Sequence, residues 1–316
     1  MAPPMTDREI LLLTHGKARP GDPDAARELK SRAKRQAQKL GAWMGAAGLR
    51  PDVTLASPAQ RALVSAEKAL KAGGWTAQGI ETDPRLYKGP VADHLAALAA
   101  HPVPRVLCAG HPGAMSRLLQ HLVPNGPKLG RGALARLILA PHGPGDLLDP
   151  ADTVRLDQIV MADDLPDSFP WPGSAERRDR PAYYYTQSAA LPYRLQNGAP
   201  EVLLITSSSG LKWGIPKGIC EPGLSPQDSA AQEALEEAGL TGHVQPEALG
   251  TYPVEKWGAT CHVTVYPMQV TAMDPDTRWD ENHRQRIWLP RAEAARQVTS
   301  LQLARLIRAW QPVPAT

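Results

Sequence analysis

The chain has 316 residues, about twice the length of a typical domain, which predicts two separate cores. Its formal net charge is only +3, and this balance argues against a protein that binds a nucleic acid polymer or a membrane surface through bulk charge. The sequence holds neither an apolar run long enough to cross a membrane nor a secretory signal, so we expect a cytoplasmic protein.

Strands and helices alternate through the first half of the sequence. Each of three short apolar runs predicts a buried strand that is followed by a loop and a helix; these runs are Glu9–Thr14, Val53–Ser57 and Val103–Ala109. The first helix is basic and is predicted for residues 25–47. The alternation predicts an α/β fold with a mainly parallel sheet, in which loops at the carboxyl ends of the strands line a crevice.

Two histidines, His15 and His111, stand in such loops, and a strand that delivers a histidine to a loop suits a nucleophile. They belong to three motifs, which are His15-Gly-Lys-Ala18, Ser57-Pro-Ala-Gln-Arg61-Ala62 and Gly110-His-Pro-Gly113. In this order the motifs resemble those of the histidine phosphatase superfamily, and in particular its SixA-type phosphohistidine phosphatases. The resemblance implies a three-layer fold, His15 as acceptor of the phosphoryl group, Arg61 as a phosphate ligand and His111 as the group that stabilises the transferred charge.

Thr14 departs from this pattern, because the family has an arginine before the first histidine. One hydroxyl cannot replace the fork of donors that a guanidinium offers to phosphate, so stabilisation of the transition state falls. Lys17 and Arg19, in the adjacent loop, are candidates for a compensating charge. We expect either a weak or specialised phosphatase, or a degenerate domain that binds phosphate or packs structurally without turnover.

A polar segment with proline and glycine, residues 173–181, predicts a linker between domains at residues 1–172 and 182–316. In the second domain, strands precede a helix at Asp228–Ala238, and further strands lead to a last helix at about Arg291–Trp310. This order predicts a mixed sheet between helices.

The helix at Asp228–Ala238 carries three carboxylates at positions i, i+3 and i+4, which are Glu233, Glu236 and Glu237. Like charges at this spacing repel unless a cation lies among them, and Mg²⁺ or Mn²⁺ prefers carboxylate oxygens. The alternative is an acidic, solvated helix face. The Gly/Pro-rich loop before the helix favours the metal site.

The segment from Gly218 to Leu240 resembles the Nudix box, Gly-x5-Glu-x7-Arg-Glu-U-x-Glu-Glu-x-Gly-U, where U is aliphatic. The matching residues are Gly218, Glu233, Glu236, Glu237, Gly239 and Leu240. The resemblance implies a Nudix α/β/α sandwich, with Glu233 and Glu237 as metal ligands and Glu236 close by. The first glutamate and the arginine of the box are Leu224 and Gln232 here, so the ion pair that braces the loop in the family is lost.

A later segment, Trp279-Asp-Glu281 followed by Arg284, resembles Nudix proteins related to diphosphoinositol-polyphosphate and diadenosine-polyphosphate hydrolases. Glu281 is either a further ligand or base, or the ion-pair partner of a nearby arginine. Lys212 and Lys217 lie near the Nudix loop and are candidates for phosphate contacts.

We therefore predict a two-domain phosphohydrolase whose Nudix domain uses Mg²⁺ or Mn²⁺ to hydrolyse a diphosphate linkage in a nucleotide-type or polyphosphorylated small molecule. Glu236, Glu237 and Glu281 are the candidates for the general base, while Gly218 stands in the substrate-binding loop. No nucleic acid polymer or membrane partner is expected, and the sequence makes no prediction of the oligomeric state.

The alternative is a regulatory module that binds phosphorylated ligands with little or no turnover. Thr14, Leu224 and Gln232 favour this alternative because each departs from a family pattern. Retention of the three glutamates argues for an enzyme.

Overall fold

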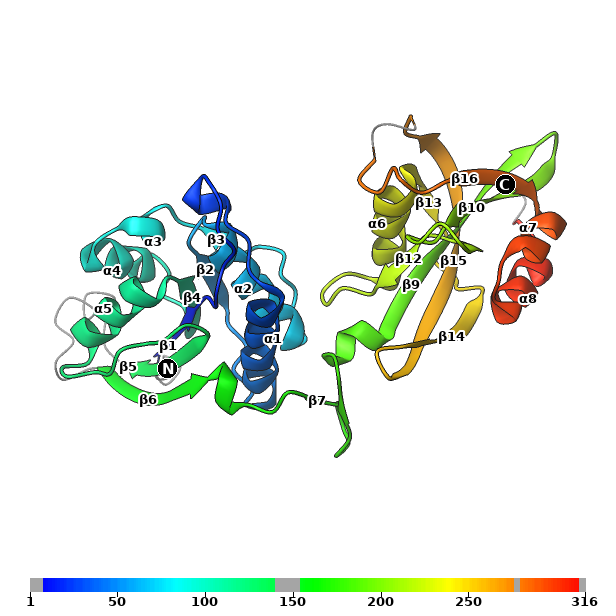
Figure 1. Ribbon diagram of the computed structural model, residues 1–316. Helices are drawn as coiled ribbons and strands as arrows, with labels where there is room; N and C mark the ends of the chain where they lie inside the picture. Colours follow the sequence, from blue (N-terminus) through cyan, green and yellow to red (C-terminus); the bar gives the residue numbers. More distant parts are fainter. Residues whose placement is uncertain (1–7, 140–153, 276–278, 313–316) are drawn as a thin grey trace, which may run out of the picture. The chain divides into compact units, whose positions relative to one another are not determined.

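The computed structural model describes residues 8–139, 154–275 and 279–312. The chain divides into two compact units, Met1–Arg177 and Arg178–Thr316 (Figure 1). The division falls within residues 173–181, although the limits of a linker there stay a prediction. No helix among the described residues combines the length and apolar character needed to cross a membrane.

The first unit contains a six-stranded sheet with the order β3-β2-β4-β1-β5-β6. Its strands are β1 (Arg8–Thr14), β2 (Val53–Ala56), β3 (Glu81–Thr82), β4 (Arg105–Gly110), β5 (Ala133–Leu139) and β6 (Val154–Met161). The first four strands pair in parallel, whereas β5 and β6 are antiparallel to their neighbours. The predicted α/β fold with a mainly parallel sheet is confirmed.

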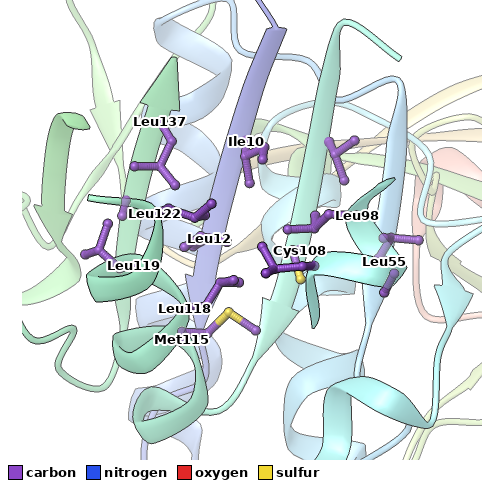
Figure 2. Close-up of a cluster of buried hydrophobic side chains, with 14 of the residues drawn as sticks. Ile10, Leu12, Leu55, Leu98, Cys108, Met115, Leu118, Leu119, Leu122 and Leu137 are labelled. Carbon is purple, nitrogen blue, oxygen red and sulfur yellow. The ribbon is translucent and has the colours of Figure 1, made fainter. Parts of the chain in front are cut away.

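Helices cover both faces of this sheet (Figure 1). The helices are α1 (Ser31–Ala46) and α2 (Gln60–Ala72) on one face, and α4 (Val91–Ala99) and α5 (Pro112–Leu122) on the other, with the short α3 (Arg85–Lys88) beside α4. Figure 2 shows Ile10 and Leu12 of β1 packed with Met115 of α5 in one core. Leu11 and Leu13 alternate with them and pack in the other core, so β1 is apolar on both faces, as is typical of a parallel strand between two helical layers.

The segment before α1 differs from the long helix predicted at residues 25–47. Only a 3₁₀ turn, η1 (Asp24–Ala26), forms there, and α1 begins at Ser31. A β-bridge between Ala18 and Leu29, supported by a bond of 2.7 Å from the Arg19 N–H to the Glu28 carbonyl, folds this segment back on itself. Backbone pairing therefore outweighs the helix propensity of the segment.

The second unit contains an eight-stranded sheet with the central order β11-β10-β9-β15-β13. Its strands are β9 (Thr186–Gln196), β10 (Ala199–Thr206), β11 (Trp213–Gly214), β12 (Lys217–Ile219), β13 (Leu240–Val244), β14 (Gly250–Lys256), β15 (Ala259–Met273) and β16 (Arg286–Pro290). Strands β9 and β15 run in parallel, whereas the other pairs are antiparallel. The predicted mixed sheet is confirmed.

Helices also lie on both faces of the second sheet (Figure 1). Helix α6 (Pro226–Ala238) covers one face, and α7 (Arg291–Gln297) and α8 (Leu301–Ala309) cover the other. The last two correspond to the single helix predicted at Arg291–Trp310. They are separate because Val298 is extended and the Ser300 hydroxyl caps α8 by accepting a bond of 3.2 Å from the Leu303 N–H.

Both ends of α6 are fixed by specific contacts. The helix starts two residues before the predicted Asp228, because the Ser225 hydroxyl caps it and Pro226 suits its first position. Gly239 ends it in the left-handed conformation, with φ of 61°. The Arg286 guanidinium donates a bond of 2.8 Å to the carbonyl of Ala238 in the last turn. These contacts set the rotation and register of the three glutamates.

One ion-pair network joins three neighbouring strands of the first sheet. The Glu9 carboxylate on β1 accepts bonds of 2.9 Å from Arg105 on β4 and 3.0 Å from Arg136 on β5. Partial burial acts to raise the pKa of Glu9, but the hydrogen bonds and charges of the two arginines outweigh it and lower the pKa from 4.5 to about 2.

We expect Glu9→Gln to weaken the first sheet by roughly 1–2 kcal/mol at pH 7, because the charge-assisted bonds are partly screened by solvent. Since the pKa in the folded state lies below its ordinary value, the stabilisation is fully present above about pH 4.5 and is lost as the pH falls towards about 2. Urea unfolding followed on the amide NMR signals of β1 should show the two proteins converging over that range. Glu28→Gln, at an exposed glutamate of the same unit, is the control. An unchanged difference between the proteins at low pH would contradict the assignment.

Candidate active sites

His15 and His111 meet at the carboxyl ends of the neighbouring strands β1 and β4. The distance from His15 Nε2 to His111 Nδ1 is 3.1 Å, and the rings lie edge to face. His15 Nδ1 lies 2.7 Å from the carbonyl oxygen of Gly16, which can only accept, so Nδ1 carries the proton. The lone pair of His15 is therefore on Nε2, towards His111 and Arg61.

Both imidazoles are neutral near pH 7. Burial lowers the pKa of His15 to about 4; the bond to Gly16 opposes this shift and the charges of Arg61, Arg131 and Arg27 add to it. Burial, followed by His15 and Arg61, lowers the pKa of His111 to about 4 as well. A neutral, oriented imidazole with its lone pair on Nε2 has the form required of a nucleophile.

Arg61, at the start of α2, lies against both histidines. Its Nε–H points at His15 Nε2 over 3.3 Å, and its Nη2 lies 3.4 Å from His111 Nδ1. The structure thus brings together the three residues predicted for phosphate chemistry in the first unit, while their roles stay predictions.

A cavity of about 400 Å³ opens beside His15. Four of the side chains that line it are cationic, namely Lys17, Arg27, Arg61 and Arg131. Arg27 and Arg131 are not predicted by the sequence motifs; the one signal for Arg131 is its place between Gly130 and Gly132. Such a lining suits a small anion with several oxygen atoms.

Asp24 provides a counter-charge inside this group. Its carboxylate accepts bonds of 2.8 Å from Arg61, 2.9 Å from Arg27 and 2.6 Å from the Tyr87 hydroxyl. The bond from Tyr87, followed by those from Arg27 and Arg61, holds the pKa of Asp24 well below its usual range, so the group is ionised. A phosphate that binds to Arg61 must therefore share the guanidinium with Asp24 or displace it.

In the second unit, the predicted glutamates lie on α6 facing different partners. Glu233 is directed at Gly218, where an added Cβ would come within 1.9 Å of its carboxylate oxygen. Glu236 accepts a bond of 2.7 Å from the side chain of Gln232, one helical turn away. Gln232 thus pairs within the helix, and this contact does not join the helix to the loop as the lost brace would.

Glu237 is buried, and its carboxylate is already paired with an arginine. Its carboxylate accepts bonds of 2.6 Å from the Arg284 guanidinium and 2.9 Å from the Lys217 N–H. The same guanidinium bonds Glu281 at 2.6 Å and the Thr206 carbonyl at 2.9 Å. The structure therefore shows Glu281 in an ion pair with a nearby arginine, while a role as ligand or base stays a prediction.

No three His, Cys, Asp or Glu side chains within residues 8–139, 154–275 and 279–312 lie together as a metal site. The predicted convergence of the three glutamates is thus not present, because Glu236 turns to Gln232 and Glu237 to Arg284. The donor set nevertheless fits a divalent cation, since Mg²⁺ needs only one or two carboxylates together with substrate phosphates and water.

Glu233 supplies the observation that supports this fit. Its carboxylate makes no hydrogen bond or salt bridge with any described residue. Burial, followed by the charges of Glu237 and Glu236, raises its pKa from 4.5 to about 8. A cation placed at this oxygen would relieve both effects.

A second cavity, of about 360 Å³, lies beside the Glu237–Arg284 pair. Lys212, Lys217 and Arg284 line its cationic part. The apolar part is formed mainly by aromatic and aliphatic residues, namely Ile205, Trp213, Ile215, Tyr252, Val254 and Leu303. The two lysines predicted as phosphate contacts therefore share one cavity, although that role is untested.

Comparison with known proteins identifies the second unit. Residues 186–310 match the family model of the NUDIX domain. Nudix hydrolase 17, mitochondrial, of Arabidopsis thaliana is 38% identical over 97 residues, which cover 30% of this chain and 52% of the relative. Nudix hydrolase 18, mitochondrial, of the same species is 35% identical over 114 residues, covering 33% of this chain and 63% of the relative. The chain thus spans 52% and 63% of the length of these two relatives. The predicted Nudix domain is confirmed.

Among solved structures, the protein histidine phosphatase SixA complexed with tungstate is similar to this chain. The match covers 49% of this chain and 97% of the other, at 20% sequence identity and a TM-score of 0.43.

We expect Asp24→Asn to strengthen the binding of inorganic phosphate roughly three- to tenfold, because it removes a negative charge from Arg61. Binding can be followed in the full chain through the ring resonances of His15, which report on this cavity alone. Glu28→Gln, at an exposed position in the same loop, removes an equal charge and should leave the affinity unchanged. Equal or weaker binding by Asp24→Asn would show that Asp24 positions Arg61 and does not compete with phosphate.

Proposed function

From the Nudix domain in its carboxy-terminal half, we propose that this chain hydrolyses the diphosphate linkage of a nucleotide-type small molecule. The observation that carries the proposal is Glu233, a carboxylate without a described partner that faces the Gly218 loop close to a cationic cavity. Glu233 belongs to neither hydrophobic core of the unit.

Glu233 would hold the divalent cation, and Glu236 and Glu237 would join it on leaving Gln232 and Arg284. When bound, Mg²⁺ or Mn²⁺ supplies charge stabilisation to the diphosphate and lowers the pKa of a water molecule. Gly218 keeps the loop close to Glu233, since any larger residue would displace the carboxylate.

The cavity beside this site suits a ligand with a charged and an apolar end. Lys212, Lys217 and Arg284 offer cations to phosphate oxygens, while the half-buried Trp213 offers aromatic surface to a base. An inositol pyrophosphate has charge on all sides and would leave the apolar wall uncovered. A nucleotide is therefore favoured over the inositol pyrophosphates that the sequence leaves open.

Glu236, Glu237 and Glu281 remain the candidates for the general base that activates water. The carboxylates of Glu237 and Glu281 are both bonded to Arg284. The Glu236 carboxylate accepts a bond from Gln232 and has no arginine partner among the described residues.

For the first unit we propose binding of a phosphoryl group with little turnover. His15 Nε2 presents its lone pair beside Arg61 and His111, as a phosphoryl acceptor requires. Thr14 is buried and bonded to backbone, so it does not reach the cavity.

A cytoplasmic location stays a prediction from the sequence.

The second candidate function is a regulatory module that binds phosphorylated ligands without turnover. The pair between Glu237 and Arg284 favours it, because the arginine already neutralises one of the expected metal ligands. Turnover assays of the full chain separate the two candidates.

We expect Glu233→Gln to lower the turnover of a dinucleoside polyphosphate by at least ~100-fold and to weaken the binding of Mn²⁺, since it deletes a ligand charge while keeping the size of the side chain. Excess chelator should abolish the activity of the unmodified chain. Glu247→Gln, at an exposed glutamate of the same unit, should behave like the unmodified chain in both assays.

Full activity of Glu233→Gln, or activity that survives the chelator, would refute the proposed role of the cation. Tight nucleotide binding without hydrolysis would support the regulatory module.

A further inference from the structure

Thr14 has a structural role at the position where the histidine phosphatase pattern has arginine. Its side chain is 2% exposed. The hydroxyl donates a bond of 2.7 Å to the carbonyl of Gly130 and accepts one of 2.9 Å from the N–H of Ala133. Thr14 thus joins the end of β1 to both sides of the turn that leads into β5.

The same turn is held at a third and a fourth point. The Gly132 N–H bonds the carbonyl of His15 at 3.4 Å, and the Gly132 carbonyl accepts a bond of 2.9 Å from Ala162. Gly132 has φ of 63°, a left-handed conformation that favours glycine. These contacts fix the backbone on either side of Arg131 relative to His15.

Arg131 projects from this turn into the lining of the cavity that also contains His15 and Arg61. Arg61 and Arg27 are both bonded to Asp24, whereas Arg131 makes no hydrogen bond or ion pair with any described residue. Its charge nonetheless reaches His15, since it contributes to the lowered pKa of that imidazole. Arg131 is therefore a guanidinium held near the histidine with its donors available.

We propose that Arg131 supplies the guanidinium that is missing at position 14, and that Thr14 is the positioning residue for it. This inference rests on the phosphoryl-binding role proposed for the first unit. The ligand class is a phosphate monoester or inorganic phosphate, whose oxygens match the planar fork of donors.

In this fold, position 14 cannot both hold the turn of Arg131 through a hydroxyl and carry the arginine of the family pattern. An arginine at position 14 would remove the hydroxyl that bonds Gly130 and Ala133, and would leave the buried N–H of Ala133 without its partner. Thr14→Arg should therefore fail to strengthen phosphate binding, although it restores the family residue.

The test is a titration of the full chain with inorganic phosphate in the presence of chelator, followed on the ring resonances of His15. Arg131→Gln should weaken binding at least about tenfold, because a charge-assisted pair of bonds is lost. Arg50→Gln, at an exposed arginine of the same unit, is the matched control and should bind as the unmodified chain does.

Thr14→Val keeps the shape of the side chain but removes the hydroxyl, and should weaken binding about as much as Arg131→Gln, while Thr14→Ser keeps the affinity. Because Thr14 acts through Arg131, the double variant that combines Thr14→Val with Arg131→Gln should bind phosphate no more weakly than Arg131→Gln alone. If Thr14→Val does not fold, the inference is tested by the phosphate affinities of Arg131→Gln and Thr14→Ser. Arg131 lies on an exposed turn, so its substitution does not disturb the core.

The inference would be overturned if the phosphate affinity of Arg131→Gln were within about twofold of that of the unmodified chain. It would also be overturned if the losses of affinity in the two single variants multiplied in the double variant. Absence of any phosphate response at His15 in the unmodified chain would instead refute the proposed function of the first unit. The two failures are therefore distinguishable, and neither depends on nucleotide hydrolysis by the second unit.

Discussion

Like charges that lie close together repel, and each unit of this chain gathers several of them at one place. The first unit collects arginines around His15, and the second collects glutamates along α6. Each group includes an ion-pair partner of the opposite sign, Asp24 among the arginines and Arg284 among the glutamates. Without a ligand, the folded state depends on these internal counter-charges, since an uncompensated buried charge is costly.

Ligand binding to Arg61 or to Glu237 consequently competes with these counter-charges. An incoming anion must share Arg61 with Asp24 or displace it, and a cation must share Glu237 with Arg284 or displace it. The free energy of binding is the difference between two sets of ion pairs, so weakly charged competitors gain little. This favours ligands with concentrated charge, such as phosphates and divalent cations.

Much of the architecture follows from local patterns. The apolar run at Ile10–Leu13 predicts a strand between two layers, and the spacing of glutamates before Gly239 predicts their shared helix. The partners of the site residues could not be predicted, because they depend on contacts distant in sequence: Thr14 bonds Gly130, and Arg284 bonds Glu237. Strand and helix periodicity contains no information on which rotamer a charged side chain adopts towards such a partner.

The loop that carries Asp24 is closed at its base by the bridge between Ala18 and Leu29. Its ends are therefore held together whatever lies between them, and entropy of loop closure changes only slowly with length. Insertions or replacements between these two residues can alter the acid presented to Arg61 while the histidines at the strand ends keep their places. The fold thus separates the part that can vary in evolution from the part that must stay fixed, and the affinity of the cavity can be retuned without redesign of the sheet.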